Sequence, residues 1–171
     1  MPKKSFRYHY RDQYGYERLE YPLFENLNIN NFKHIVLRSG YDDLILVSSG
    51  TLLRDPLSSE FWRFTGNLVS ASKFAHLFLN DQYWGIYNIR ESVDEDFIED
   101  HLGTNNFDMI RYQKTGPELK YGDWSEWNRL DSFVLNTNFS NDNAYYQLTK
   151  IVDINNFLNL LAFVHCSQYR S

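Results

Sequence analysis

Five charged side chains occupy positions from which they could contact phosphate groups. Lys3 and Lys4 open the first expected strand, Asp55 and Glu60 lie on the first expected helix, and Glu91 ends an apolar hairpin. In kinase folds a strand lysine, paired with a carboxylate on a helix, holds the phosphates of a nucleotide. These residue types therefore permit nucleotide binding. An acidic helix beside a basic strand gives the same pattern in a purely structural ion pair, so both interpretations stay open.

The sequence lacks the motifs of several other common functional sites. The sequence contains neither G-x-x-x-x-G-K-[ST] nor G-x-G-x-x-G, the two standard phosphate-binding loops. Its five histidines never pair at the spacing of metal ligands, and we expect no metal site from them. The single cysteine excludes an internal disulfide. A net charge of −5 argues against a nucleic acid as a general partner. No apolar run approaches the length of a membrane span, and no signal peptide is visible.

The clearest structural element is a hairpin from Phe74 to Glu91. Two short aromatic-rich runs flank the polar break Asn80-Asp81-Gln82, and each run alternates as a half-buried strand does. Asn and Asp tolerate the dihedral angles of a tight turn. Gly85 lies inside the second run, where it permits a bulge or the close approach of a ligand or another backbone.

The remaining pattern predicts strands early and helices late. A helix should begin near Arg54 or Asp55, and the sequence Ser92-Val93-Asp94-Glu95 matches a capping box for the next helix, which should end at Gly103. We therefore expect an α+β fold. The other expected elements are extended segments at Ser5–Tyr10, Leu19–Phe24, Phe32–Leu37 and Asp108–Tyr112, a helix carrying Trp127 and capped by Ser125 or Asp123, a helix from Asn141 to Val152, and a final helix capped by Asp153.

Aromatic residues make up 18% of the chain, which excludes disorder and raises a second functional hypothesis. Most of these rings must belong to the core. The remainder suggest a non-catalytic interaction module that binds a protein or a glycan. The rings considered for this role are Tyr83, Trp84, Tyr121, Trp124 and Trp127.

An ordered series of motifs resembles the CotH kinase-like family, that is, spore coat protein H and its relatives. The hairpin motif, Leu79 to Glu91, is the strongest piece, and the resemblance extends from Lys3 to about Leu161. The other motifs are Lys3-Lys4-Ser5-Phe6-Arg7, Tyr14-Gly15, Tyr21-Pro22-Leu23-Phe24, Val36-Leu37-Arg38-Ser39-Gly40, Leu53-Arg54-Asp55 and Asp153-Ile154-Asn155-Asn156-Phe157.

The resemblance implies an atypical protein-kinase-like fold. Residues 1–91 would form the N-lobe, an antiparallel sheet with one helix, and residues 92–171 the first helices of the C-lobe, with an irregular insert at 104–124. ATP with Mg²⁺ or Mn²⁺ would serve as cofactors, and Ser or Thr of coat or surface proteins would accept the phosphate. A spore-coat or cell-surface location is implied in the same way.

The same resemblance implies roles for individual residues. The lysine contacting phosphate would be Lys4 rather than Lys3, and its ion-pair partner would be Asp55 or Glu60. Glu91 would lie near the hinge, at the adenine end of the site.

One part of the family pattern has no counterpart in this sequence. The final helix should lead into a catalytic loop of the form Asn-x-Asp-Trp-x-x-Asn-Asn and then a metal-binding Asp, whereas the chain reads Phe163 to Ser171 without them. The expectation is a C-terminally truncated domain, lacking the catalytic base and metal ligands and inactive on its own. An exposed apolar face on the final helix would then favour self-association or a partner.

Overall fold

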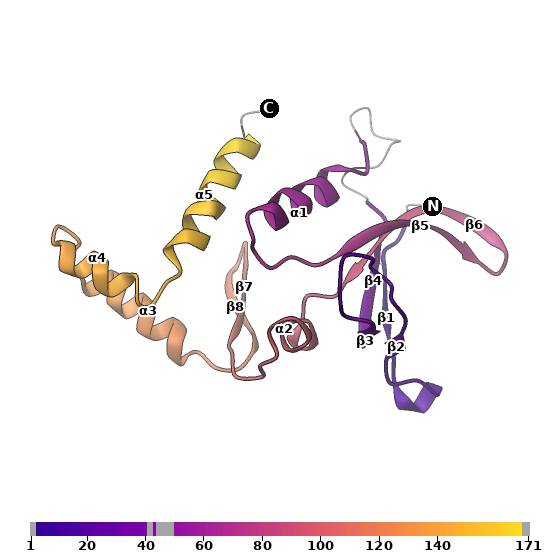
Figure 1. Ribbon diagram of the computed structural model, residues 1–171, viewed down its shortest axis with the longest axis horizontal. Helices are drawn as coiled ribbons and strands as arrows, with labels where there is room; N and C mark the ends of the chain where they lie inside the picture. The colour runs from indigo at the N-terminus through magenta and orange to yellow at the C-terminus, as the bar shows by residue number, and fades with distance from the viewer. Residues whose placement is uncertain (1–2, 41–42, 44–49, 169–171) are drawn as a thin grey trace. The chain divides into compact units, whose positions relative to one another are not determined.

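The computed structural model describes residues 3–40, 43 and 50–168, and its chain divides into two compact units, Met1–Asn105 and Asn106–Ser171 (Figure 1). Helices and antiparallel strands are both present, which confirms the α+β class. The first unit holds β1 (Phe6–His9), β2 (Leu19–Glu20), β3 (Asn31–Phe32), β4 (His34–Arg38), α1 (Arg54–Phe64), β5 (Ser72–Leu79), β6 (Gln82–Glu91) and α2 (Glu95–Leu102), with a 3-10 turn at Asp12–Tyr14. The second holds β7 (Met109–Gln113), β8 (Gly116–Tyr121), α3 (Ser125–Asn136), α4 (Asp142–Leu148) and α5 (Ile154–Gln168). The expected boundary after Glu91 remains a prediction.

A four-stranded antiparallel sheet organises the first unit. Its strand order is β1-β4-β6-β5, and the short pair β2-β3 forms a separate ribbon. Helix α1 follows β4 in the chain, and the β5–β6 hairpin follows α1 and returns β6 to a place beside β4 (Figure 1). The strand before the helix is therefore paired with the second strand of the hairpin, and β5 lies at the sheet edge beyond β6.

The β5–β6 hairpin has the predicted turn. Asn80 and Asp81 both adopt positive φ angles, 49° and 61°, as a two-residue turn between twisted strands requires. The strand register shifts between Leu77 and Phe78, opposite Gly85, whose φ is 105°. The expected bulge is confirmed, whereas the neighbour of Gly85 is the side chain of Lys3, whose Cε would lie 3.7 Å from a Cβ added to the glycine.

The core of the first unit lies against one face of the sheet. Tyr87 is only 1% exposed, its ring lies 6.0 Å from that of Phe6, and its hydroxyl donates to the Lys4 carbonyl at 3.0 Å. Phe24 and Phe32 meet edge to face at 5.5 Å, which closes the β2–β3 ribbon over the sheet. The buried cluster consists of Leu23, Phe24, Phe32, Ile35, Leu37 and Tyr87.

Helix α1 begins at Arg54, as predicted, but the N-cap of α2 is not the expected one. The side chain of Asp94, not that of Ser92, accepts a hydrogen bond from the backbone nitrogen of Phe97. Ser92 is buried beside the end of β6 and cannot act as the cap, so the predicted capping box is wrong. The helix ends at Gly103 in the left-handed conformation, as predicted.

The second unit has one more strand than the sequence predicted. The segment expected to be an irregular insert with a single strand forms the β7–β8 hairpin instead. Asp123 accepts from the Ser125 nitrogen at 2.6 Å before α3, and Asp153 accepts from the Asn156 nitrogen at 3.0 Å at the start of α5. Asp153 therefore caps the helix for which it was predicted, whereas the N-cap of α3 is Trp124 and neither predicted residue, Ser125 or Asp123, occupies that position. Tyr169, Arg170 and Ser171 lie outside the described residues.

Among the residues that the structure describes, no helix combines the length and the apolar character needed to cross a bilayer.

Replacing Tyr87 with Phe should lower the free energy of unfolding by about 1 kcal/mol. The substitution leaves the buried ring in place and removes only the donor to the Lys4 carbonyl. Urea denaturation followed by tryptophan fluorescence measures the change. Tyr14→Phe is the matched control because Tyr14 is 74% exposed, and equal stability of the two variants would contradict a structural role for the Tyr87 hydroxyl.

Candidate functional site

A cavity of about 390 Å³ lies between α1 and the sheet face formed by β4, β5 and β6. Its polar wall includes the guanidinium groups of Arg38 and Arg54, and its apolar wall includes Phe74 and Ile86. The full lining is Ser5, Arg38, Ser39, Gly40, Asp43, Leu52, Arg54, Asp55, Pro56, Phe74, Ile86 and Asn88. The space is of the size that small-molecule ligands occupy in proteins.

Strand alternation places polar side chains in this cavity. Tyr87 and Ile89 belong to the core on one face of β6, so Asn88 and Arg90 must point to the opposite face. Arg38 pairs with Asn88 across β4 and β6, which brings the two side chains to the same face. One sheet therefore separates an apolar core from a polar cavity.

Asp55 joins α1 to two strands. Its Oδ2 atom lies 2.7 Å from Nη1 of Arg38 and 2.7 Å from Nη1 of Arg90. The Arg90 side chain is only 13% exposed, and its Nη2 also lies 3.4 Å from the Ser59 hydroxyl on α1. Burial is the main cause that lowers the pKa of Arg90 below its ordinary value, while Asp55 opposes this shift. The carboxylate is thus shared by two adjacent cations and fixes the start of the helix.

Asp43 performs a related task at the helix start. Its carboxylate accepts hydrogen bonds from the backbone nitrogens of Thr51, at 2.8 Å, and Arg54, at 2.9 Å. These hydrogen bonds hold the pKa of Asp43 below its ordinary value, and the bond from Thr51 is the largest cause. The carboxylate is therefore ionised at neutral pH and already committed to the backbone.

The two N-terminal lysines lie apart from Asp55. Lys3 donates to the carbonyl oxygens of Ser39 and Ile86 and lies over the Tyr87 ring at 4.2 Å, and burial lowers its pKa. Lys4 is exposed, and neither lysine is among the residues that line the cavity. The structure pairs Asp55 with arginines, whereas Lys3 connects the residue after β4, Ser39, to the middle of β6 at Ile86.

Glu60 and Glu91 also have partners within the protein. Glu60 pairs with Arg63, about one turn further along α1, with 2.7 Å between its Oε2 atom and Nη2 of the arginine. Glu91 is 5% exposed; its carboxylate accepts from the Ala71 nitrogen at 2.7 Å and contacts Nε2 of His101 at 2.9 Å. Of the four site candidates Lys4, Asp55, Glu60 and Glu91, only Asp55 lines the cavity.

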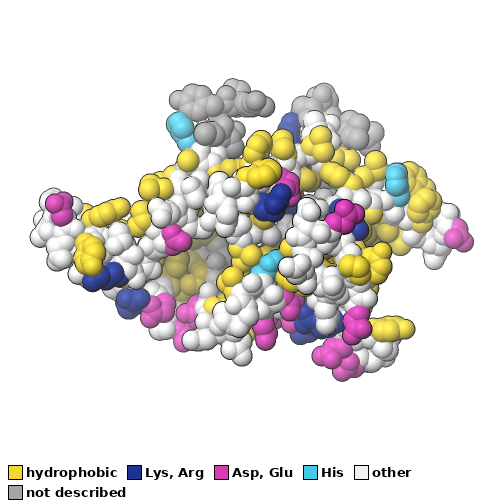
Figure 2. All heavy atoms as spheres, viewed as in Figure 1, with side chains coloured by type: hydrophobic (Ala, Val, Ile, Leu, Met, Phe, Trp, Pro, Cys, Tyr) yellow, Lys and Arg dark blue, Asp and Glu magenta, His cyan; other side chains and the backbone are white. Residues whose placement is uncertain are grey.

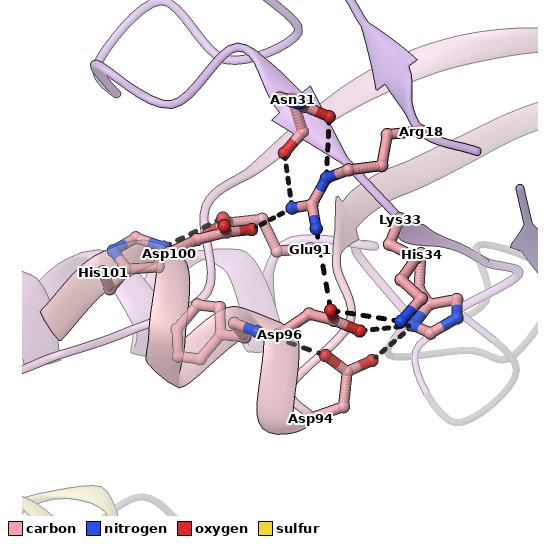
Figure 3. Close-up of polar contacts among 10 residues, drawn as sticks. Arg18, Asn31, Lys33, His34, Glu91, Asp94, Asp96, Asp100 and His101 are labelled. Carbon is pink, nitrogen blue, oxygen red and sulfur yellow. Dashed lines mark hydrogen bonds and ion pairs between the residues drawn. The ribbon is translucent and has the colours of Figure 1, made fainter. Parts of the chain in front are cut away.

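Figure 3 shows a polar cluster that joins α2 to the neighbouring strands. His34 Nδ1 lies 3.0 Å from Asp94, and Lys33 and Arg18 lie 3.3 Å and 3.6 Å from Asp96. Arg18 also reaches Asp100 at 2.5 Å. The cluster fixes α2 against β4 through charges from separate parts of the first unit.

Three members of this cluster, His34, Asp94 and Asp96, have the residue types of metal ligands, and their ligand atoms lie within 4.8 Å of one another. Lys33 and Arg18 already compensate the charge of Asp96, and the hollow beside the group measures only about 10 Å³. A divalent ion would have to displace these cations. The group therefore fits an internal ion network better than a metal centre.

The cavity itself is suited to an anion. Arg38, Arg54, Ser39 and Asn88 line it, and arginine is well matched to phosphate oxygens. Arg38 lies 2.7 Å from Asp55 and Arg54 lies 3.5 Å from Asp43, so a phosphate would share both guanidinium groups with these carboxylates. Among the described lining residues, the two carboxylates, Asp43 and Asp55, are already bonded to backbone nitrogens or arginines. The cavity residues thus fit a nucleotide phosphate and do not fit a Mg²⁺ or Mn²⁺ ion.

Sequence reasoning missed Arg38 and Asn88 as site residues. Both lie in motifs that resemble the CotH family, but their partners are distant in sequence. Asp55, for example, comes 17 residues after Arg38. The alternation of β6 was a usable signal, because it places Asn88 on the face opposite Tyr87. The same alternation places Arg90 and Glu91 on opposite faces of the sheet.

A family model described as CotH kinase protein matches residues 1–169, nearly the whole chain. No curated protein matched the sequence.

Replacing Glu91 with Ala should lower the free energy of unfolding by about 3 kcal/mol, because the Ala71 nitrogen and the His101 ring lose their buried acceptor. Urea denaturation measures the loss, and Glu99→Ala on the exposed side of α2 is the matched control. A variant of unchanged stability with weakened ATP binding would instead support a hinge role for Glu91.

Proposed function

We propose that this chain, which belongs to the CotH kinase protein family, binds the phosphates of ATP in the cavity between α1 and the sheet. Arg38 is the phosphate contact and Asp55 its ion-pair partner. The observation that carries the proposal is the 2.7 Å contact between these two residues at the cavity wall. ATP would supply the phosphoryl group, which kinases transfer to a hydroxyl acceptor.

The order of elements supports this assignment. In protein kinases the ion pair joins a strand lysine to a glutamate of the helix αC. Here Arg38 ends β4, Asp55 lies in the first turn of the helix that follows, and the β5–β6 hairpin comes next. The pair has the same signs of charge on the same kinds of element, with arginine and aspartate in place of lysine and glutamate.

Arginine also suits the phosphate better than the exposed Lys4 does. Arg38 lines the cavity, and its planar guanidinium offers two parallel donors to a phosphate while its other edge holds Asp55. Lys4 points its backbone carbonyl at Tyr87 and does not line the cavity. We therefore keep Asp55 from the sequence prediction and propose Arg38 for the role first given to Lys4.

The acceptor proposed from the family resemblance is a Ser or Thr hydroxyl of a coat or surface protein. The printed sequence contains no Asn-x-Asp-Trp-x-x-Asn-Asn motif, and no described residue takes the role of catalytic base or metal ligand in the cavity. We assign the binding of nucleotide, and not the transfer step, to these residues. A protein of this sequence alone should bind ATP and turn it over slowly.

Isothermal titration calorimetry with ATP and MgCl₂ tests the proposal. The wild-type chain should bind ATP, and Arg38→Ala should weaken binding about tenfold or more, because a charge-assisted bond to phosphate contributes about 1.5–3 kcal/mol. Arg63→Ala is the matched control, since Arg63 is an ion-paired arginine that does not line the cavity.

Lys4→Ala distinguishes the two assignments. Unchanged affinity for ATP would support Arg38 as the phosphate contact, whereas a loss confined to Lys4→Ala would restore the lysine assignment. Absence of binding to the wild-type chain, with no thermal stabilisation by ATP, would reject a nucleotide site.

A second candidate function is the binding of a protein or glycan by exposed rings of the hairpin. Figure 2 shows hydrophobic side chains gathered over the outer part of the β5–β6 hairpin. Phe78 and Tyr83 are exposed with ring centroids 5.2 Å apart, and Tyr83 also lies beside His76. Trp84 instead packs edge to face on Phe6. Tyr121, Trp124 and Trp127 belong to the second unit.

Binding of the purified chain to a glycan array or a coat extract tests this candidate. The double variant Phe78→Ser with Tyr83→Ser should lose any such binding and keep its affinity for ATP, because both rings lie outside the cavity lining. Equal binding by the variant and the wild type would reject the hairpin as the contact.

Helix α5 is the proposed surface for self-association. Phe157 and Leu158 are adjacent and exposed, and the exposed Leu161 follows them about one turn along the helix. Sedimentation velocity over a range of concentrations should show a dimer that Leu158→Glu converts to a monomer. A wild-type chain that sediments as a monomer at all concentrations would contradict this part of the proposal.

A further inference from the structure

We infer that Asn88 reads the base of the nucleotide, by pairing its side-chain amide with adjacent donor and acceptor atoms on one edge of adenine. This inference rests on the proposed function, which gives the phosphates of ATP a contact in the cavity but gives none to the base. It makes Asn88 a specificity-determining residue.

The first observation is an unsatisfied buried amide. Asn88 is 7% exposed, and neither Oδ1 nor Nδ2 has a hydrogen-bond partner among the described residues. Buried polar side-chain atoms in native proteins nearly always have a partner, because removing them from water without one destabilises the fold. An unpaired asparagine amide at a cavity wall is therefore typical of a group whose partner is a ligand.

The second observation is the row of side chains in which Asn88 stands. The strand register pairs Asn88 with Arg38 on β4 and with Phe74 on β5, so a guanidinium, an amide and a phenyl ring follow one another across the sheet. All three line the cavity. The row passes from a cationic end to an aromatic end, in the order in which a nucleotide presents its phosphates and its base.

A further hollow extends the aromatic end of the cavity. It measures about 350 Å³ and shares Leu52, Phe74 and Ile86 with the cavity. Its lining is mostly apolar, with His76 at its rim. A flat base can therefore lie on Phe74 and Ile86 while its polar edge faces Asn88.

The chemistry of the amide selects the partner. An asparagine side chain offers one acceptor oxygen and one donor nitrogen side by side. Phosphate oxygens only accept, so a phosphate would satisfy Nδ2 and leave Oδ1 unpaired. Adenine places its N6 amino donor beside the acceptor N7, and asparagine pairs with both at once. The corresponding edge of guanine presents two acceptors, O6 and N7, and leaves Oδ1 without a donor.

The variant Asn88→Leu tests the inference with three ligands. Calorimetry should show that the wild type binds ATP more tightly than GTP, and that the variant loses about tenfold or more of its ATP affinity. Binding of inorganic tripolyphosphate, which has no base, should be the same for both proteins. The urea midpoint of the ligand-free variant should stay equal or rise, because leucine removes two unpaired buried atoms.

Asn26→Leu is the matched control, since Asn26 is exposed and does not line the cavity, and its ATP affinity should be unchanged. Equal ATP affinity of wild type and Asn88→Leu would overturn the inference and leave the nucleotide site intact. A fall in tripolyphosphate affinity would assign Asn88 to the phosphates, and a lower urea midpoint would assign it to the fold; either overturns base reading. A wild type that binds neither ATP nor tripolyphosphate would overturn the proposed function as well.

Discussion

The cavity depends on one helical carboxylate that two neighbouring arginines share. Arg38 and Arg90 come from adjacent strands and both reach the Oδ2 atom of Asp55 at 2.7 Å. Without a shared anion, two cations on one sheet face would repel each other, and the one that is largely buried would remain uncompensated. Asp55 is 48% exposed, so the arrangement leaves one side of the group open to solvent and to a ligand.

The strand alternation of β6 serves both the fold and the site. Tyr87 and Ile89 face the core, while Asn88 and Arg90 face α1. Because successive side chains of a strand point to opposite faces of the sheet, a residue of β6 that packs in the core leaves its neighbour on the face of the cavity. Glu91 completes the strand by fixing the Ala71 backbone and His101 of α2, so the hairpin connects the sheet to the next helix as well.

Local elements of this structure could be predicted from the sequence. The turn at Asn80-Asp81, the start of α1 at Arg54 and the N-cap at Asp153 all rest on a few adjacent residues, and all three were correct. The capping box at Ser92 was wrong because Asp94, two residues on, offered the helix a better-placed acceptor. β8 was missed because Gly116 and Pro117 interrupt the alternation from which strands are recognised.

The candidate site was less predictable because its contacts join residues that are distant in sequence. Asp55 was named from its place on the helix, but nothing local distinguished Arg38 from Lys4 as its partner. The distinction arises only when β4 and β6 pair and place Arg38, Asn88 and Arg90 on one face. Glu91, adjacent to Arg90, then necessarily turns to the other side, where burial and two hydrogen bonds give it a structural role.

The position of α1 and the proposed binding of a phosphate draw on the same guanidinium group. Few apolar contacts hold this helix, since Leu57, Phe61 and Phe64 are all exposed, and Asp55, Ser59 and Asp43 supply its polar anchors. A phosphate at Arg38 would share that side chain with Asp55, so ligand and helix must influence each other through one charge balance. Arg90 also contacts Asp55 and does not line the cavity, so we expect it to keep this bond when Arg38 meets a phosphate. Two arginines on one carboxylate therefore allow one of them to turn to a ligand while the other retains the helix.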